Sequence, residues 1–278
     1  MNRRVLITGA AGGMGRACAR LFGATQDLIL TDVAEEPLSR FAEELRVEGY
    51  NIVGVHVGDL ASEALLSGLA NELAGDAAFT LLHTAGLSPS QAEWQSIMTV
   101  NLIATERLLR AVEPVITPGT VGIVIASTAG HLLPPIAAAQ SILDEPLMDD
   151  LFERIGPLIA AMAAQAGPAG TRGIAYSLSK QAVLRLCERR APSWGKRGAR
   201  IVTISPGLIL TPMGRRELAE TPGAAEMRDA APAGRPGTPM DIALAAQFLA
   251  SDSASFITGS DLKVDGGSIA AIRTFAAK

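Results

Sequence analysis

The sequence has 278 residues with a formal net charge of −4 at pH 7, and it is 48% hydrophobic but only 4% aromatic. A chain of this length can form one large domain or two small ones, and its acidic balance argues against a nucleic-acid or anionic-membrane partner. No apolar run is long enough to cross a bilayer, and glycines interrupt the amino-terminal apolar run before it could serve as a signal peptide. We therefore expect one domain over residues 1–278 of a cytoplasmic protein.

The cysteines and histidines give no sign of a metal site. Cys18 and Cys187 lie far apart in predicted helices and have no partner motif, so we expect free thiols in a reducing compartment. The three histidines are scattered, and no metal-ligand spacing occurs.

The first predicted element is a short buried strand, Val5–Ile7, followed by a glycine-rich turn and a helix. Such a turn lets backbone N–H groups at the start of the helix face a pyrophosphate. Its glycines, Gly9, Gly13 and Gly15, are spaced differently from the usual G-x-G-x-x-G pattern. The alternative is that these glycines serve only close packing.

The second predicted strand, 28–31, ends at Asp32, which lies 19 residues after Gly13. An acidic side chain at this place accepts hydrogen bonds from the adenosine ribose and repels a 2′-phosphate. Asp32 therefore favours NAD(H) over NADP(H). It could also cap the following helix, and the two roles can coexist.

Two further strands are predicted over 52–57 and 79–83. Asp59 follows the first of them and could contact an adenine edge or cap the next helix. Ala85 and Gly86 follow the second, and such small residues at the end of a strand would admit a flat ligand.

A long amphipathic helix is predicted over 94–112, with Asn101 polar between two apolar neighbours. An asparagine inside a helix is usually exposed or satisfied locally, so a functional role for Asn101 needs other support.

The fifth predicted strand, 120–126, ends at Ser127. Five strands that alternate with helices indicate a parallel sheet with right-handed crossovers. Ligands bind outside the carboxyl ends of such strands, and the glycine-rich turn, Asp32, Asp59, Gly86 and Ser127 all fall there.

Tyr176 and Lys180 lie four residues apart on a predicted helix, so they project from the same side. A cation close to a phenol favours the phenolate and lowers the phenol's pKa from about 10. The pair could therefore act as a general acid and base. The alternative is a surface tyrosine and lysine that happen to fall in register.

The remaining elements are a strand over 199–205, a helix over 239–251 and a strand over 262–264. The segment between the first two, about 208–238, is rich in alanine, proline, glycine and arginine. We expect it to be a mobile lid over the substrate, or otherwise an ordinary surface loop.

Taken in this order, the motifs resemble the short-chain dehydrogenase/reductase family. The resemblance covers nearly the whole chain, and the residues that carry it are Thr8-Gly9-x-x-x-Gly13-Met14-Gly15, Asp59-Leu60, Ala85-Gly86, Asn101, Ser127, Tyr176-x-x-x-Lys180, Pro206-Gly207 and Asp265-Gly266-Gly267. The resemblance implies an α/β fold: a Rossmann-type, doubly wound parallel sheet of about seven strands flanked by helices.

The resemblance also implies roles for four catalytic residues. Tyr176 would exchange a proton with the substrate, and Lys180 would bind the nicotinamide ribose and lower the pKa of Tyr176. Ser127 would bind the substrate oxygen, and Asn101 would hold a water molecule in a proton relay. The implied cofactor-binding set is Gly9, Gly13, Met14, Gly15, Asp32, Asp59, Leu60, Ala85, Gly86, Tyr176, Lys180, Pro206, Gly207, Ile209 and Thr211, with the last two near the nicotinamide carboxamide.

Two departures from the family pattern stand out. His83-Thr84 replaces Asn-Asn, and we expect His83 to support the sheet edge rather than to act in catalysis. Ser127 and Tyr176 are 49 residues apart, and the excess, about 132–172, is predicted to be a small helical insertion that ends in a flexible link. Its position resembles that in the bacterial 3α-hydroxysteroid dehydrogenase/carbonyl reductase group.

The residues and the resemblance together predict an NAD(H)-dependent oxidoreductase that interconverts a secondary alcohol and a ketone, with a steroid-like or other apolar substrate. The first alternative is a 3-oxoacyl-thioester reductase, which Asp32 disfavours because such enzymes commonly prefer NADPH. The second is a non-catalytic NAD-sensing regulatory protein, which would not need the four catalytic residues. The family expectation is a homodimer or homotetramer without a bound metal, and we expect the insertion to alter one of the usual interfaces.

Overall fold

The computed structural model describes residues 3–165, 170–220, 228–229 and 231–276. Its centre is one parallel sheet of seven strands in the order β3-β2-β1-β4-β5-β6-β7. The predicted Rossmann-type sheet is thus confirmed. The strands are β1 (Arg4–Thr8), β2 (Asp27–Asp32), β3 (Ile52–Val57), β4 (Phe79–His83), β5 (Val121–Ile125), β6 (Arg200–Pro206) and β7 (Asp261–Val264).

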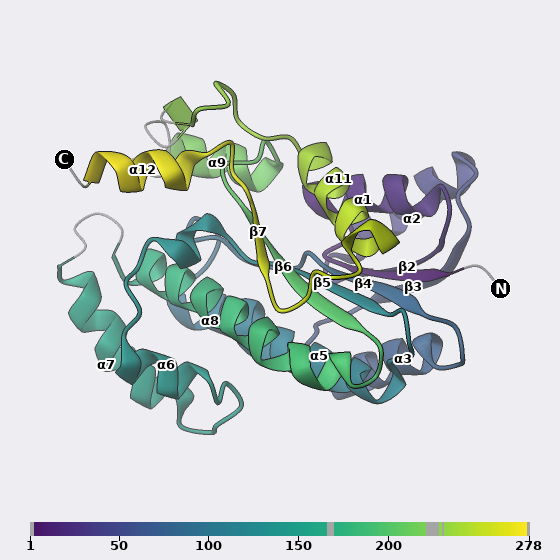
Figure 1. Cartoon of the computed structure of the whole chain (residues 1–278), viewed down its shortest axis with the longest axis horizontal. Coiled ribbons are helices and arrows are strands. Elements are labelled where there is room, and N and C mark those ends of the chain that lie inside the picture. Colours follow the sequence, from purple (N-terminus) through teal and green to yellow (C-terminus); the bar gives the residue numbers. More distant parts are fainter. Residues whose placement is uncertain (1–2, 166–169, 221–227, 230, 277–278) are drawn as a thin grey trace.

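Helices cover both faces of the sheet (Figure 1). One face packs against α1 (Gly13–Gly23), α2 (Glu35–Val47) and α11 (Pro239–Ala250), and the other against α3 (Glu63–Leu73), α5 (Ala104–Val112) and α8 (Gly170–Gly195). Because helices cover both faces, β4 and β5 are buried at every position, and their residues are mostly apolar, with Thr80 and His83 as the polar members of β4. The chain reverses its winding direction between β1 and β4, where doubly wound folds bind their ligands.

The predicted helix over 94–112 is confirmed, and it contains a π-helical turn that was not predicted. It consists of α4 (Trp94–Met98), one π-helical turn over Thr99–Ile103 and α5. The π-helical turn contains Asn101, and such turns inside α-helices are frequent at functional sites.

The segment that precedes α8 is helical, as predicted. It forms α6 (Ala137–Leu143) and α7 (Leu151–Ala163), and α7 buries Ile155 and Ile159 in the same core as α8. The expected flexible link, 167–170, lies almost entirely outside the described residues. That this segment is an insertion relative to the family stays a prediction.

Part of the expected lid is a regular helix, α9 (Pro212–Glu220), rather than an irregular loop. Residues 221–227 and 230 of the predicted lid lie outside the described residues. The last helix of the described residues, α12 (Ser268–Ala276), has Ser268 and Ile269 buried in its first turn.

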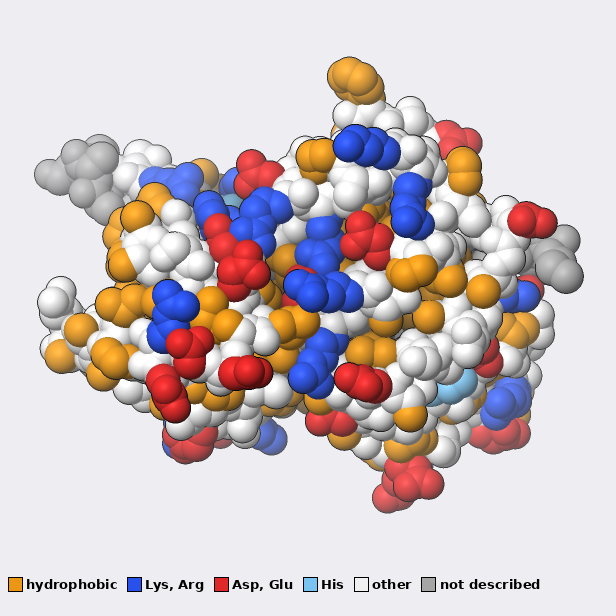
Figure 2. Space-filling model, turned by 90° about the horizontal axis from the view of Figure 1, so that it is seen from below, with side chains coloured by type: hydrophobic (Ala, Val, Ile, Leu, Met, Phe, Trp, Pro, Cys, Tyr) orange, Lys and Arg blue, Asp and Glu red, His pale blue; other side chains and the backbone are white. Residues whose placement is uncertain are grey.

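On the side of α5 and α8, acidic and basic side chains alternate across the surface (Figure 2). Glu106 on α5 pairs with Arg190 on α8 at 2.9 Å, and Arg185 on α8 pairs with Asp144 at 2.6 Å. Both cysteines are buried free thiols, as expected. In the described part of the chain, no helix has the length and hydrophobicity that crossing a membrane requires.

Candidate active site

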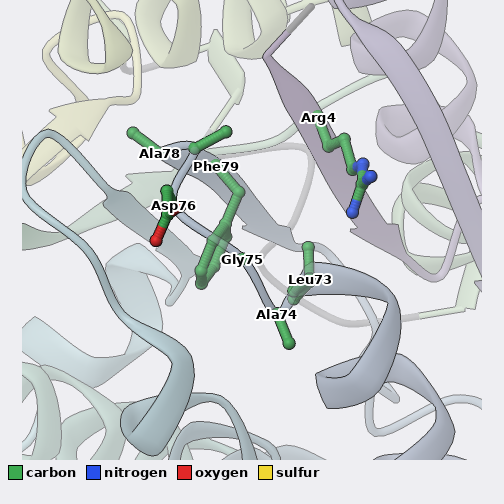
Figure 3. A pocket seen from close by; sticks show the side chains of 8 residues that line it. Arg4, Leu73, Ala74, Gly75, Asp76, Ala78 and Phe79 are labelled. Carbon is green, nitrogen blue, oxygen red and sulfur yellow. The ribbon is translucent and has the colours of Figure 1, made fainter. Parts of the chain in front are cut away.

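The carboxyl ends of the strands border a cavity of about 400 Å³. Nine of the predicted site residues line it: Met14, Gly86, Ser127, Tyr176, Lys180, Pro206, Gly207, Ile209 and Thr211. A second crevice, of about 50 Å³, lies at the other edge of the sheet between Arg4, Leu73 and Phe79 (Figure 3). It is too small for a nucleotide, and none of the predicted site residues lines it.

The glycine-rich turn is held by close packing around β1. Gly9 has φ +64°, and a Cβ on it would lie 2.7 Å from the backbone nitrogen of Ala85. A Cβ on Gly15 would lie 2.3 Å from the carbonyl oxygen of Gly9, and one on Gly13 would lie 2.7 Å from Thr211. These glycines therefore bring α1, the end of β4 and the start of α9 together. The packing role is confirmed, and the pyrophosphate role stays a prediction.

Two acidic residues lie along the same edge of the sheet, beyond the cavity. Asp32 accepts hydrogen bonds from the backbone N–H groups of Ala11 and Ala34, both at 3.0 Å, so it joins the glycine-rich turn to the start of α2. Asp59 accepts one from Ala61 at 2.8 Å. Leu60, which follows it, is buried in the core that contains α3, and its side chain packs there rather than against the cavity.

Ser127, Tyr176 and Lys180 meet inside the cavity. Ser127 directly follows β5, and the other two side chains come from α8. The Ser127 hydroxyl accepts a hydrogen bond from the N–H of Ala129 at 3.1 Å and is hydrogen-bonded to Tyr176. Lys180 is only 5% exposed, and its ammonium donates to the carbonyl oxygen of Ile125 at 2.9 Å.

Burial controls the protonation of this group. It raises the pKa of Tyr176, and the negative charge of Glu217 adds to this effect while the hydrogen bond with Ser127 opposes it. Burial also lowers the pKa of Lys180 to about 8, against the effect of Glu217. The expected lowering of the Tyr176 pKa is therefore not seen in the protein alone, because the loss of solvent outweighs any attraction from the lysine.

Asn101 is satisfied within the fold and does not line the cavity. Its Oδ1 accepts from the N–H of Leu87 at 2.8 Å, and its Nδ2 donates to the Leu87 carbonyl at 3.0 Å and to Ser179 Oγ at 3.2 Å. A Cβ on Gly86 would lie 3.2 Å from Asn101 Oδ1 and 3.4 Å from Lys180 Nζ. Asn101 thus fixes the loop after β4, and its predicted water-binding role stays a prediction.

His83 supports the sheet, as expected. Its Nδ1 is hydrogen-bonded to Thr8 on β1 and its Nε2 to Thr105 on α5, both at 2.7 Å. Burial and the nearby charge of Lys180 lower the pKa of His83 to about 3, so the ring is neutral at physiological pH.

Glu217 is the site residue that sequence reasoning missed. It lines the cavity from α9, is hydrogen-bonded to Ser88 and interacts with Lys180. Burial raises the pKa of this carboxyl, and both neighbours oppose that effect. The available signal was the helical spacing of Met213, Gly214 and Glu217, which places the three on one face of a helix.

Comparison with known proteins places this geometry in a family. A model described as short chain dehydrogenase matches residues 3–141, and one described as enoyl-(acyl carrier protein) reductase matches residues 145–268. The chain belongs to the short-chain dehydrogenase/reductase family. It is an oxidoreductase of alcohols and ketones, in a family that uses nicotinamide cofactors.

Two curated relatives are named for polyols. D-Threitol dehydrogenase of Mycolicibacterium smegmatis is 30% identical over 94% of this chain and 91% of its own length. Galactitol 2-dehydrogenase (L-tagatose-forming) of Cereibacter sphaeroides is 30% identical over 94% of this chain and 92% of its own. Among solved structures, the 3-alpha-hydroxysteroid dehydrogenase of Pseudomonas sp. B-0831 with NADH matches with a TM-score of 0.74 and 27% identity, covering 98% of each chain.

Proposed function

We propose that the protein is an NAD(H)-dependent dehydrogenase that interconverts a secondary alcohol and a ketone, with Tyr176 as the general acid and base. The observation that carries this proposal is the meeting of Ser127, Tyr176 and Lys180 in one cavity at the carboxyl edge of the sheet. The polyol names of two relatives support an alcohol with several hydroxyl groups over a steroid-like substrate.

The residues along this edge fit a nicotinamide dinucleotide. The small residues at positions 9, 13 and 86 leave a path beside α1 and β4, where a side chain at Gly86 would meet Asn101 and Lys180. Each carboxylate oxygen of Asp32 accepts one backbone hydrogen bond and retains an acceptor position for a ribose hydroxyl. The negative charge of Asp32 would repel a 2′-phosphate, which supports NAD(H) over NADP(H).

In the proposed mechanism the bound nicotinamide supplies or accepts the hydride. The Ser127 hydroxyl, fixed by the N–H of Ala129, hydrogen-bonds the substrate oxygen. Tyr176 gives its proton to that oxygen during ketone reduction and takes one from the alcohol during oxidation. Lys180 holds a positive charge beside the phenol and binds the cofactor ribose, and Asn101 keeps the loop after β4 in place.

The test is binding and turnover with a matched pair of variants. We expect wild-type protein to bind NADH more tightly than NADPH in a fluorescence titration and to oxidise at least one member of a panel of secondary alcohols. Tyr176→Phe should keep the NADH affinity and lose most turnover, because the ring stays while the proton donor is removed. Tyr50→Phe, the same change at the other tyrosine of the chain, which does not line the cavity, is the matched control and should remain active. Near-normal activity of Tyr176→Phe would contradict the assignment of the general acid and base.

The second candidate is reduction of a 3-oxoacyl thioester, which the match of residues 145–268 to an enoyl-(acyl carrier protein) reductase model favours. Such substrates carry phosphate groups on their thioester arm. The carboxylate of Glu217 in the cavity argues against such a ligand, and Asp32 argues against the NADPH that these enzymes commonly prefer. Turnover of acetoacetyl-CoA with NADPH, at a rate above that of any simple ketone with NADH, would support it instead.

We also propose a cytoplasmic homo-oligomer that associates through α11. Met240, Leu244 and Phe248 recur every four residues and are 42%, 51% and 46% exposed, so they form an apolar stripe on this helix. An exposed apolar stripe of this kind indicates a protein–protein interface.

A further inference from the structure

The cavity contains a carboxylate that the proposed reaction does not use. Glu217 and Met213 are four residues apart on α9, so both face the cavity. This face of the helix is held inward, because a Cβ on Gly214 would lie 1.9 Å from the carbonyl oxygen of Ile209. The position of α9 against the end of β6 therefore directs Glu217 into the cavity, where its charge acts on Tyr176 and Lys180.

The neighbours of Glu217 hold its carboxylate in place without satisfying it fully. The Ser88 hydroxyl, which is buried in the loop after β4, hydrogen-bonds this carboxylate. An ionised carboxylate has about four acceptor positions, so one hydroxyl leaves room for further donors. A half-buried carboxylate that faces a cavity favours a ligand that donates a hydrogen bond to it, because a buried acceptor without a donor is unfavourable.

The charges around the cavity determine which kind of ligand group can donate a hydrogen bond to Glu217. The ammonium of Lys180 interacts with Glu217 and already balances its charge, so a cationic ligand would bring a second positive charge next to Lys180. An anionic ligand would be repelled by Glu217 itself. A neutral hydroxyl group is the donor that satisfies the carboxylate without adding charge.

We propose that Glu217 is a specificity-determining residue that accepts a hydrogen bond from a substrate hydroxyl other than the one that reacts at Tyr176. The inference rests on the proposed function and narrows its substrate to a polyol or a hydroxyketone. The apolar wall formed by Leu87, Leu132 and Leu208 contacts the carbon chain of such a substrate. The expectation of a largely apolar substrate is therefore replaced by that of a substrate with one polar and one apolar side.

The test uses four secondary alcohols that share one skeleton and differ only in the remote group. These are 1,3-butanediol, 2-pentanol, 4-aminobutan-2-ol and 4-hydroxypentanoate, which present a hydroxyl, a methyl, an ammonium and a carboxylate group. The ratio of kcat/KM for the diol to that for 2-pentanol measures the preference for the remote hydroxyl. A hydrogen bond to a charged acceptor contributes enough that we expect this ratio to fall about tenfold or more in Glu217→Leu.

Two further variants distinguish an effect of the Glu217 charge from an effect of a change in the fold. Glu217→Gln keeps an acceptor oxygen, so the ratio should fall less than in Glu217→Leu, while turnover of 4-hydroxypentanoate should rise relative to the diol. Glu220→Gln removes a carboxylate from an exposed position of the same helix and should leave both ratios as in wild type. The NADH affinity of each variant, measured by fluorescence, shows whether the cofactor site is still folded.

The inference is overturned if the ratio of diol to 2-pentanol is the same in wild type and Glu217→Leu, or if 4-aminobutan-2-ol is the preferred substrate of the wild type. If no member of the series is oxidised, calorimetric binding of the four alcohols to the NAD⁺-bound enzyme gives the corresponding ratios of affinity without turnover. Failure to bind NADH at all would contradict the proposed function. Normal NADH binding without a remote-hydroxyl preference would contradict only the role of Glu217.

Discussion

Lys180 shows how an active-site residue is kept at the expense of stability. Its pKa is lowered by burial from 10.5 to about 8, so the folded protein binds its proton less tightly than the unfolded chain does. Between those pH values the unfolded state holds more protons, and the free energy of unfolding therefore rises with pH. Below pH 8 the buried ammonium destabilises the folded state by about 3 kcal/mol, since each pKa unit corresponds to ~1.4 kcal/mol.

We therefore predict that Lys180→Met raises the melting temperature of the cofactor-free protein at pH 7, with a gain that shrinks as the pH is raised from 8 to 10.5. The corresponding gain in the free energy of unfolding is reduced by about 1 kcal/mol at all pH values, because the Ile125 carbonyl loses its hydrogen-bond donor. Lys196→Met, at an exposed position after α8, is the control and should show no such pH dependence. A gain that stays constant from pH 7 to 10.5 would contradict the destabilisation of the folded state by the buried ammonium.

Asp32 allows a second prediction at the scale of one side chain. Asp32→Asn combined with Val33→Arg should lower the ratio of kcat/KM for NADH to that for NADPH by tenfold or more. Asparagine removes the charge and keeps one acceptor oxygen, and the adjacent Val33, which is 70% exposed, has room for a guanidinium that binds a 2′-phosphate. Val33→Arg alone is the matched control. Unchanged cofactor selectivity in the double variant would remove Asp32 from the discriminating role.

At the scale of elements, Asn101 joins the π-helical turn to the loop after β4 and to α8. Asn101→Ala should lower the free energy of unfolding by about 2 kcal/mol, because the half-buried N–H and carbonyl of Leu87 would both lose their partners. Thr99→Ala, in the same turn but with a local bond to the Gln95 carbonyl, should cost less than about 1 kcal/mol. Urea unfolding of both variants measures the difference, and equal losses would contradict the special role of Asn101.

At the same scale, the strands could be predicted from the sequence, whereas the π-helical turn and α9 could not. Apolar runs such as the one in β5 located the strands to within one or two residues, because a strand buried on both sides admits few polar residues. The π-helical turn escaped prediction because it preserves the apolar character of 94–112 and changes only the backbone hydrogen bonds. The helical structure of α9, within the expected lid, was not predicted because its arginines and its glycine obscured the inward face formed by Met213 and Glu217.

At the scale of the whole molecule, convergence at one sheet edge could be predicted from chain order, but the electrostatics inside the cavity could not. The carboxyl ends of parallel strands lie together by topology alone, so Ser127 and the glycine-rich turn were placed on the same edge from the sequence. The raised pKa of Tyr176 instead depends on how deeply α8, α9 and β5 bury the phenol and on the approach of Glu217 from a distant element. Both are products of tertiary packing.

The same packing changes how the assembly should be tested. Deleting the helical segment between Ser127 and Tyr176 would remove Ile155 and Ile159 from the main core, so loss of assembly in that variant would not be separable from unfolding. A substitution on the apolar stripe of α11 avoids this problem.

We predict that Phe248→Glu, on that stripe, lowers the mass measured by light scattering to half of the wild-type value or less, because a buried charge without a partner destabilises an interface. Val47→Glu, at an 81% exposed position at the end of α2, should keep the wild-type mass. A wild-type mass for Phe248→Glu would place the interface on another face, and a monomeric wild type would contradict the proposed oligomer.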